Sequence, residues 1–192
     1  MNHIRRILGT VATAIVLVTL TTHTASALAW ELSGTRSIAL HARDGSKIVI
    51  GSVDFTGPPN DTQFKIALDH HQLKDHFLSM REFKCREGGT EILCHVPYPY
   101  PHSGRVSLQD LAWLEHSLLF FFKLPRDFGA KLWNGIYYKL VATEQGLVGT
   151  AQAVDLNQIG APPADPTIPP FSSAERSEIP SGSRWFEKLT IE

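Results

Sequence analysis

The sequence predicts an α+β domain, in which a curved, mainly antiparallel sheet or partial barrel carries one amphipathic helix before the last hairpin. Three observations predict this class: short β-rich segments separated by turn residues, one segment of helical periodicity after Ser107, and no long apolar segment beyond residue 29. The hairpins would supply about seven strands, and a helix with one apolar side must pack on the sheet that they form.

The first 29 residues predict a Sec-type signal peptide. Arg5 and Arg6 precede an apolar stretch from Ile7 to Leu20, and small residues then lead to an A-x-A site that ends at Ala29. The apolar stretch is shorter than the roughly 20 residues that a membrane-spanning helix needs. The protein is therefore expected to be cleaved after Ala29 and to be secreted or periplasmic.

The composition is that of one globular domain. Residues 30–160 are expected to form it, and residues 161–192 a tail rich in proline and serine. The formal net charge is −1 and no basic run is present, which argues against nucleic acid and against an anionic membrane surface as partners. No stable membrane span is expected after cleavage.

The first two strands are expected near residues 36–43 and 46–55, because Asp-Gly between β-rich segments is the strongest short hairpin signal. Two prolines in the loop 56–60 end the second strand. A third strand should follow over residues 64–68, where apolar and polar side chains alternate.

The segment DHHQLKDH, residues 69–76, concentrates histidine and aspartate. We expect a polar turn between strands with solvated histidines. The alternative is a zinc or copper site, although helical spacing would supply only two ligands where such a site needs three or four. The candidate ligands are His70, His71, Asp75 and His76.

Cys85 and Cys94 are expected to form a disulfide between strands near 77–86 and 91–97. A two-residue turn at Gly89-Thr90 places the two cysteines directly opposite each other. In an oxidising compartment a lone cysteine pair indicates a bridge rather than thiol ligands or a redox site.

The segment that follows the stapled hairpin must leave the sheet, because prolines alternate with tyrosines from Pro97 to Pro101. Tyr98 and Tyr100 are expected to pack back on the sheet, or alternatively to be displayed for a partner.

One helix is expected from Leu108 to Phe122. Ser107 is a good N-cap, leucines recur at helical spacing, and Pro125 stops the pattern. The stretch LLFFF, residues 118–122, is apolar nearly all round, so this end of the helix should be buried.

A last hairpin is expected from residues 136–144 and 147–156, around Gln145-Gly146. Small residues at 149, 151 and 153 keep one face thin, either for close packing or to leave room for a ligand. The proline-rich tail should be extended or partly disordered, and its apolar end, which includes Trp185 and Phe186, either docks as an edge strand or serves as a recognition segment.

The function that these patterns favour is an exported, non-catalytic binding or accessory module that recognises a protein partner or a small apolar ligand. No phosphate-binding loop, HExxH, CxxC or GxSxG motif occurs, so no catalytic residue and no cofactor is predicted. The candidate contact residues are Tyr98, Tyr100, Trp185 and Phe186.

Two alternatives remain open. One is a periplasmic metal-binding accessory protein that uses the His-rich loop. The other is a hydrolase without a recognisable motif, which would place a serine or aspartate beside His41, His95 or His116.

Overall fold

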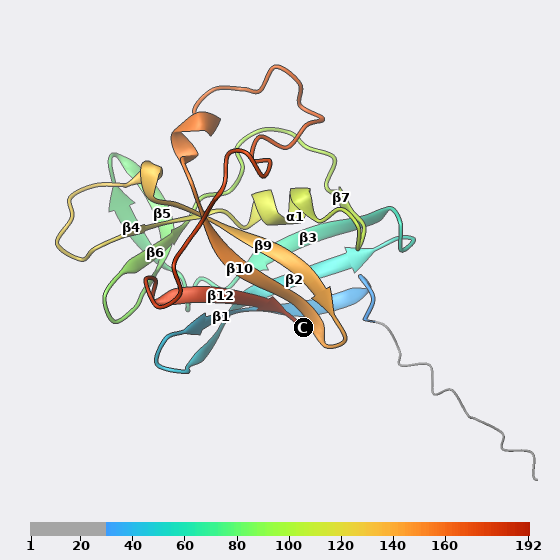
Figure 1. Ribbon diagram of the computed structural model, residues 1–192, viewed down its shortest axis with the longest axis horizontal. Coiled ribbons are helices and arrows are strands. Elements are labelled where there is room, and N and C mark those ends of the chain that lie inside the picture. Colours follow the sequence, from blue (N-terminus) through green and yellow to red (C-terminus); the bar gives the residue numbers. More distant parts are fainter. Residues whose placement is uncertain (1–29) are drawn as a thin grey trace, which may run out of the picture.

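The computed structural model describes residues 30–192, so the predicted signal peptide lies outside the described part of the chain. Residues 30–192 form one large sheet of 12 strands with one short α-helix (Figure 1). The predicted α+β class is therefore wrong. The sheet is larger than the seven strands expected, and the single α-helix in the described residues has only six residues.

The strands are β1 (Gly34–Ala42), β2 (Lys47–Thr56), β3 (Thr62–Leu68), β4 (Lys74–Leu78), β5 (Arg81–Glu87), β6 (Ile92–His95), β7 (Arg105–Val106), β8 (Phe120–Lys123), β9 (Gly135–Thr143), β10 (Gly146–Val154), β11 (Ser177–Glu178) and β12 (Phe186–Ile191). The helices are α1 (Ala112–Ser117) and two 3-10 helices, η1 (Leu132–Asn134) and η2 (Leu156–Ile159).

The strand order is β4-β5-β6-β8-β9-β10-β12-β1-β2-β3-β7, and β11 pairs with β10 beside this path. Each pairing found in residues 30–192 is antiparallel. Of the two alternatives for the apolar C-terminal segment, the structure contains the docked strand. That strand, β12, is interior rather than at an edge, because it lies between β10 and β1.

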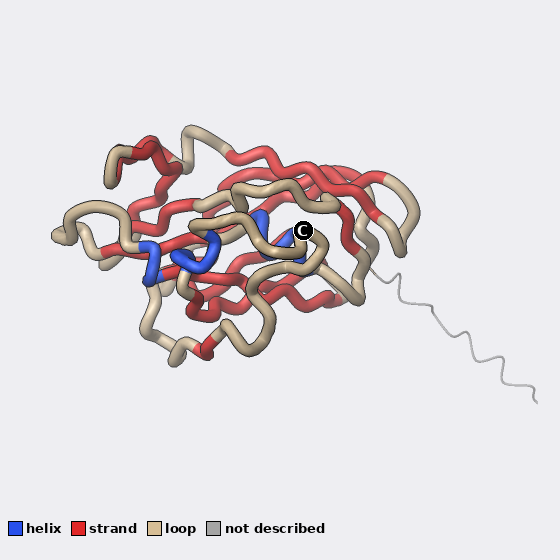
Figure 2. The backbone as a smooth tube through the Cα atoms, turned by 90° about the horizontal axis from the view of Figure 1, so that it is seen from above, coloured by secondary structure: helices blue, strands red, loops and turns tan. Residues whose placement is uncertain are grey.

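The sheet curls, so that strands far apart in its order face each other. Phe64, Ile66 and Leu68 of β3 line a cavity together with His95 at the end of β6. Helix α1 lies between the facing parts of the curled sheet (Figure 2). The His102 ring stacks between Phe64, at 6.0 Å, and Trp113 of α1, at 5.1 Å, and thus joins β3 to the helix.

The local hairpin signals gave the correct pairs at both ends of the domain. The Asp44-Gly45 turn joins β1 to β2, with φ +86° at Gly45 and the Asp44 carboxylate accepting the Ser46 amide. Strands β9 and β10 form the predicted last hairpin. A Cβ at Gly149 would lie 3.1 Å from the Tyr138 Cβ, so the thin face of β10 serves close packing there.

The strand expected over residues 77–86 is instead a hairpin of β4 and β5. Ser79 and Met80 form its two-residue turn, with φ +48° and +63° and with Leu78 paired to Arg81. Such a turn normally carries asparagine and glycine, because other residues are strained at positive φ. The sequence therefore contains no turn signal at this position.

The predicted helix over residues 108–122 is also corrected. Only Ala112–Ser117 is α-helical, and Phe120–Lys123 is strand β8, which pairs with β6 and β9. The stretch LLFFF, residues 118–122, is apolar on all sides because a strand inside a covered sheet has two buried faces. Short apolar segments do not distinguish a buried helix from a buried strand, and pairing with β6 decides the outcome.

Candidate ligand-binding site

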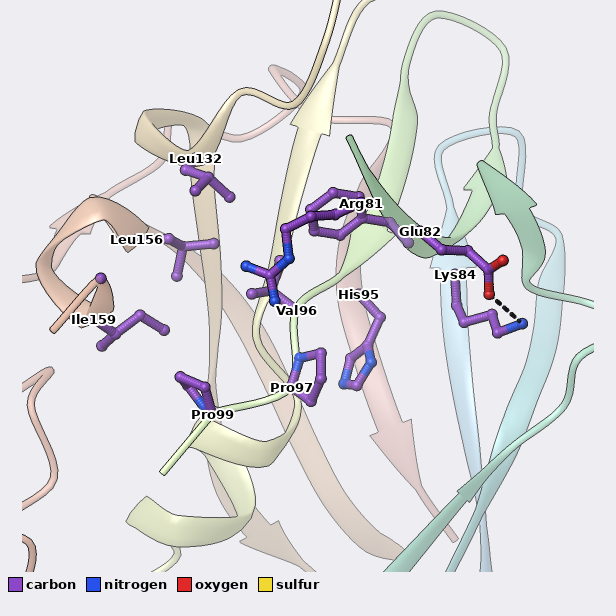
Figure 3. A pocket seen from close by; sticks show the side chains of 12 residues that line it. Arg81, Glu82, Lys84, His95, Val96, Pro97, Pro99, Leu132, Leu156 and Ile159 are labelled. Carbon is purple, nitrogen blue, oxygen red and sulfur yellow. Dashed lines mark ion pairs between the residues drawn. The ribbon is translucent and has the colours of Figure 1, made fainter. Parts of the chain in front are cut away.

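A cavity of about 300 Å³ lies between the β5–β6 hairpin and the two 3-10 helices. Its apolar wall comes from four separate parts of the chain, and Figure 3 shows most of these side chains around one space. The apolar lining residues are Phe83, Val96, Pro97, Pro99, Leu132, Leu156 and Ile159.

The disulfide fixes the hairpin that forms one side of this cavity. Cys85 and Cys94 are bonded, with an S–S distance of 2.02 Å, and they pair in the register that the turn geometry predicted. The Gly88 amide donates to the Glu91 carbonyl at 2.8 Å and closes the turn. The bridge holds the strand that carries Arg81 and Lys84 against the strand that carries His95.

The proline-rich strap, residues 96–101, forms the wall that runs from the hairpin toward η2. Prolines at 97 and 99 line the cavity, and the Tyr100 hydroxyl donates to the Ile159 carbonyl at 3.2 Å. This hydrogen bond connects the strap to η2. The proline rings restrict φ, so this wall loses little conformational entropy when a ligand binds.

The two cations at the cavity differ in their contacts with the rest of residues 30–192. Lys84 makes an ion pair with Asp75 and lies 3.6 Å from the Glu82 carboxylate. Arg81 makes no ion pair or side-chain hydrogen bond with any residue in 30–192. Figure 3 shows its guanidinium between Leu156 on one side and Pro97 on the other.

His95 forms the deepest polar part of the site. The side chain is buried, and its Nε2 lies 3.0 Å from the carbonyl oxygen of Ser117, an acceptor that requires the proton on Nε2. Burial lowers the pKa of His95 below its usual value of 6.5. The imidazole is therefore neutral at pH 7 and contributes no charge to the cavity.

A second cavity, of about 340 Å³, adjoins the first and shares His95 and Pro97 with it. Its other walls come from β3 and from the aromatic pair Tyr98 and His102. The Tyr98 hydroxyl is buried and has no hydrogen-bond partner among the described residues.

The four candidate metal ligands do not form one site. His70 and His71 are exposed in a turn that the Asp69 carbonyl closes by accepting the Leu73 amide at 2.9 Å. Asp75 and His76 lie on β4, where Asp75 pairs with Lys84 and His76 Nε2 lies 3.8 Å from the Glu87 carboxylate. Within residues 30–192, no group of three or more His, Cys, Asp or Glu side chains is placed to hold a metal ion.

The three histidines named for a hydrolase have other partners. His41 Nε2 lies 2.9 Å from the Thr190 hydroxyl. His116 uses both ring nitrogens on backbone groups, and His95 contacts the backbone of Ser117. In the described part of the chain, no serine hydroxyl or aspartate carboxylate hydrogen-bonds to these three rings.

The candidate contact residues lie mostly in the packed interior. Tyr98 packs edge-on against Tyr100 at 5.6 Å, and Phe186 is 1% exposed in β12. The Trp185 ring covers the Gly88-Gly89 turn so closely that a Cβ at Gly88 would lie 2.3 Å from it. These rings leave little free surface for a partner.

Sequence reasoning missed the residues that define the cavity. Arg81 follows a turn without a turn signal, and Leu132, Leu156 and Ile159 belong to short 3-10 helices that have no periodicity to detect. In residues 30–192 no helix is both long and apolar enough to cross a membrane. Comparison with protein-family models, with curated proteins and with solved structures finds no significant match to this chain.

Proposed function

We propose that the protein is an exported, non-catalytic binding module that holds a small amphipathic anion, with the apolar part in the cavity beside η2 and the anionic group on Arg81. The observation that carries the proposal is an apolar cavity across which the side chain of Arg81 projects. In residues 30–192, Arg81 makes no ion pair.

The size and lining of the cavity support a small ligand. Its volume of about 300 Å³ is at the lower end of the range for ligand pockets, which are mostly apolar with a few placed polar groups. A carboxylate or sulfate can accept two parallel hydrogen bonds from a guanidinium, and this fixes the orientation of the bound molecule. Burial of the alkyl or aryl part against Phe83 and Leu156 would supply most of the affinity.

Binding rather than catalysis is supported by the state of the polar groups. The buried His95 is neutral and bonded to a backbone carbonyl, and Lys84 is held by two carboxylates. Export is supported by the disulfide, because such bonds persist in oxidising compartments. The predicted signal peptide points to the same compartments.

The test is displacement of a fluorescent amphipathic anion, anilinonaphthalene sulfonate, by decanoate and by the uncharged decanol. We expect decanoate to displace the dye from the wild-type protein. Arg81→Gln should weaken decanoate binding about tenfold, because one charge-assisted interaction is lost. The same substitution should leave decanol binding unchanged.

Lys65→Gln is the matched control, since Lys65 is exposed on β3 and does not line the cavity. It removes the same charge elsewhere on the surface and should not change the affinity for decanoate. Equal losses in Arg81→Gln and Lys65→Gln, or no displacement of the dye from the wild-type protein, would contradict the proposal.

A further inference from the structure

Large exposed apolar side chains gather at one end of the molecule. Seven large hydrophobic residues are exposed in residues 30–192, and four of them belong to the β4–β5 hairpin or to the segment after β8. We call these four the apolar tip: Phe77, Met80, Phe128 and Trp133, which are 76%, 87%, 94% and 60% exposed.

The two segments that carry the apolar tip are joined to each other. The Ala130 amide donates to the Ser79 hydroxyl at 2.9 Å, and a Cβ at Gly129 would lie 2.8 Å from the same oxygen. Figure 1 shows the β4–β5 hairpin and the loop after β8 at the same end of the molecule. The tip is therefore one surface, although its residues are about 50 positions apart in sequence.

The backbone at the apex is strained in a way that packing does not explain. In the described residues, Ser79 and Met80 are the only positions other than glycine with positive φ. The Met80 side chain is 87% exposed, so the turn gains no core contact from it. Residues held in strained backbone conformations cluster at functional sites, and contiguous exposed apolar surface marks interaction sites.

Three cations adjoin the residues of the apolar tip in the chain. Arg81, Arg126 and Lys131 make no ion pair with any residue in 30–192. Two carboxylates adjoin these cations in sequence: Asp127 accepts the Leu124 amide at 3.1 Å, and Glu82 lies 3.6 Å from Lys84 Nζ. Lys131 Nζ lies 5.2 Å from the centre of the Trp133 ring, and tryptophan with lysine is typical of the membrane interface.

We propose that the apolar tip inserts into the head-group region of a phospholipid bilayer, and that the cavity behind it receives its amphipathic anion from that surface. The second clause rests on the proposed function. The tip continues directly into the cavity, because Arg81 and Leu132, neighbours of Met80 and Trp133 in the chain, both line it. Arg126 and Lys131 would contact lipid phosphates while the apolar side chains enter below them, and Arg81 would hold the anionic group of the ligand in the cavity.

A lipid surface fits this tip better than a protein partner does. A stable protein interface buries roughly 800 Å² on each side around a continuous apolar centre. In this tip the apolar side chains come from the β4–β5 hairpin and from the separate segment after β8, and cations adjoin them in the chain. The proposal departs from the sequence-based expectation against anionic membranes, which relied on the absence of a basic run; the cations come together only in the fold.

The experiment is flotation of the purified protein with vesicles of phosphatidylcholine, with and without phosphatidylglycerol. The test variant carries Met80→Ser and Phe128→Ser. The matched control carries Val141→Ser and Ile168→Ser, which remove two apolar side chains that are 59% and 61% exposed elsewhere. We expect the partition coefficient of the test variant to fall at least about tenfold and that of the control to stay unchanged.

Two further readouts separate docking from ligand binding. Trp133 fluorescence should be quenched by brominated lipids, and Trp133→Phe should remove that quenching. Decanoate affinity without vesicles should be the same in the test variant as in the wild type, which also shows that the variant is folded.

Absence of flotation of the wild-type protein, or equal losses in the test and control variants, would overturn the docking proposal, even if the tip were then found to bind a protein. Flotation together with no affinity for decanoate would support docking and contradict the proposed function instead. Decanoate binding without flotation would support the proposed function and contradict the docking proposal.

Discussion

His116 is buried in α1 with a defined proton position. Its Nδ1 donates to the Ala112 carbonyl at 2.7 Å, and its Nε2 accepts the Phe171 amide at 3.1 Å. The Phe171 ring stacks on the imidazole at 5.5 Å. Burial lowers the pKa of His116 from 6.5 to about 4. A proton on Nε2 would break the hydrogen bond from the Phe171 amide, which holds the C-terminal segment that contains Phe171 to the core.

Because the pKa of His116 is lowered in the native state, the free energy of unfolding should decrease as the pH decreases. Between pH 7 and pH 5 the unfolded chain takes up a proton on His116 and the native chain does not, so the free energy of unfolding should drop by about 2 kcal/mol. His95, whose pKa burial also lowers, acts in the same direction. Urea unfolding across this range should show the fall, and His116→Gln should make it shallower. If the slope were unchanged in that variant, Nε2 of His116 would not be the acceptor for the Phe171 amide.

At the scale of elements, the β5–β6 hairpin is the part of the fold most dependent on its covalent bond. It is short, with four residues in β6, and Cys85 pairs directly with Cys94. Replacing both cysteines by alanine should lower the free energy of unfolding by about 2–3 kcal/mol, since the unfolded chain loses a constraint. Urea unfolding with and without a reductant measures this: the wild type should respond to the reductant, and the double variant should not.

The elements also show what the sequence could and could not predict. Where a turn carried its own chemistry, the pairing followed from local rules, as at Asp44-Gly45 and Gly89-Thr90, and at Gly89-Thr90 the register followed as well. The β8 segment has no such signal, because it becomes a strand only by pairing with residues 92–95. The residues of the cavity could not be predicted for the same reason: Arg81 and Ile159 share a cavity only through the curl of the sheet.

At the scale of the whole molecule, β12 completes the sheet. Residues 186–191 pair with β1 on one side and with β10 on the other, and Leu189 is fully buried. Glu91, in the turn before β6, accepts the Trp185 amide at 3.0 Å and the Phe186 amide at 3.3 Å, which fixes where the strand begins.

This position predicts an unusual hydrogen-exchange pattern. Segments near a chain terminus commonly fray and exchange with little free energy. The β12 amides should instead exchange only by global unfolding, with the same free energy as those of β1 and β10. Native-state exchange at low urea concentrations measures this, and faster exchange of β12 alone would show that the sheet does not depend on it.

The interior place of β12 also sets the order of events when the chain is made. Ile38 of β1 pairs with Ile191 of β12. Strand β1 therefore has only one of its two neighbouring strands until nearly all of residues 30–192 have been synthesised. Synthesis and folding are thereby separated in time. A chain that completes its sheet late keeps apolar strands exposed for longer, and such chains are the ones that chaperones bind during synthesis.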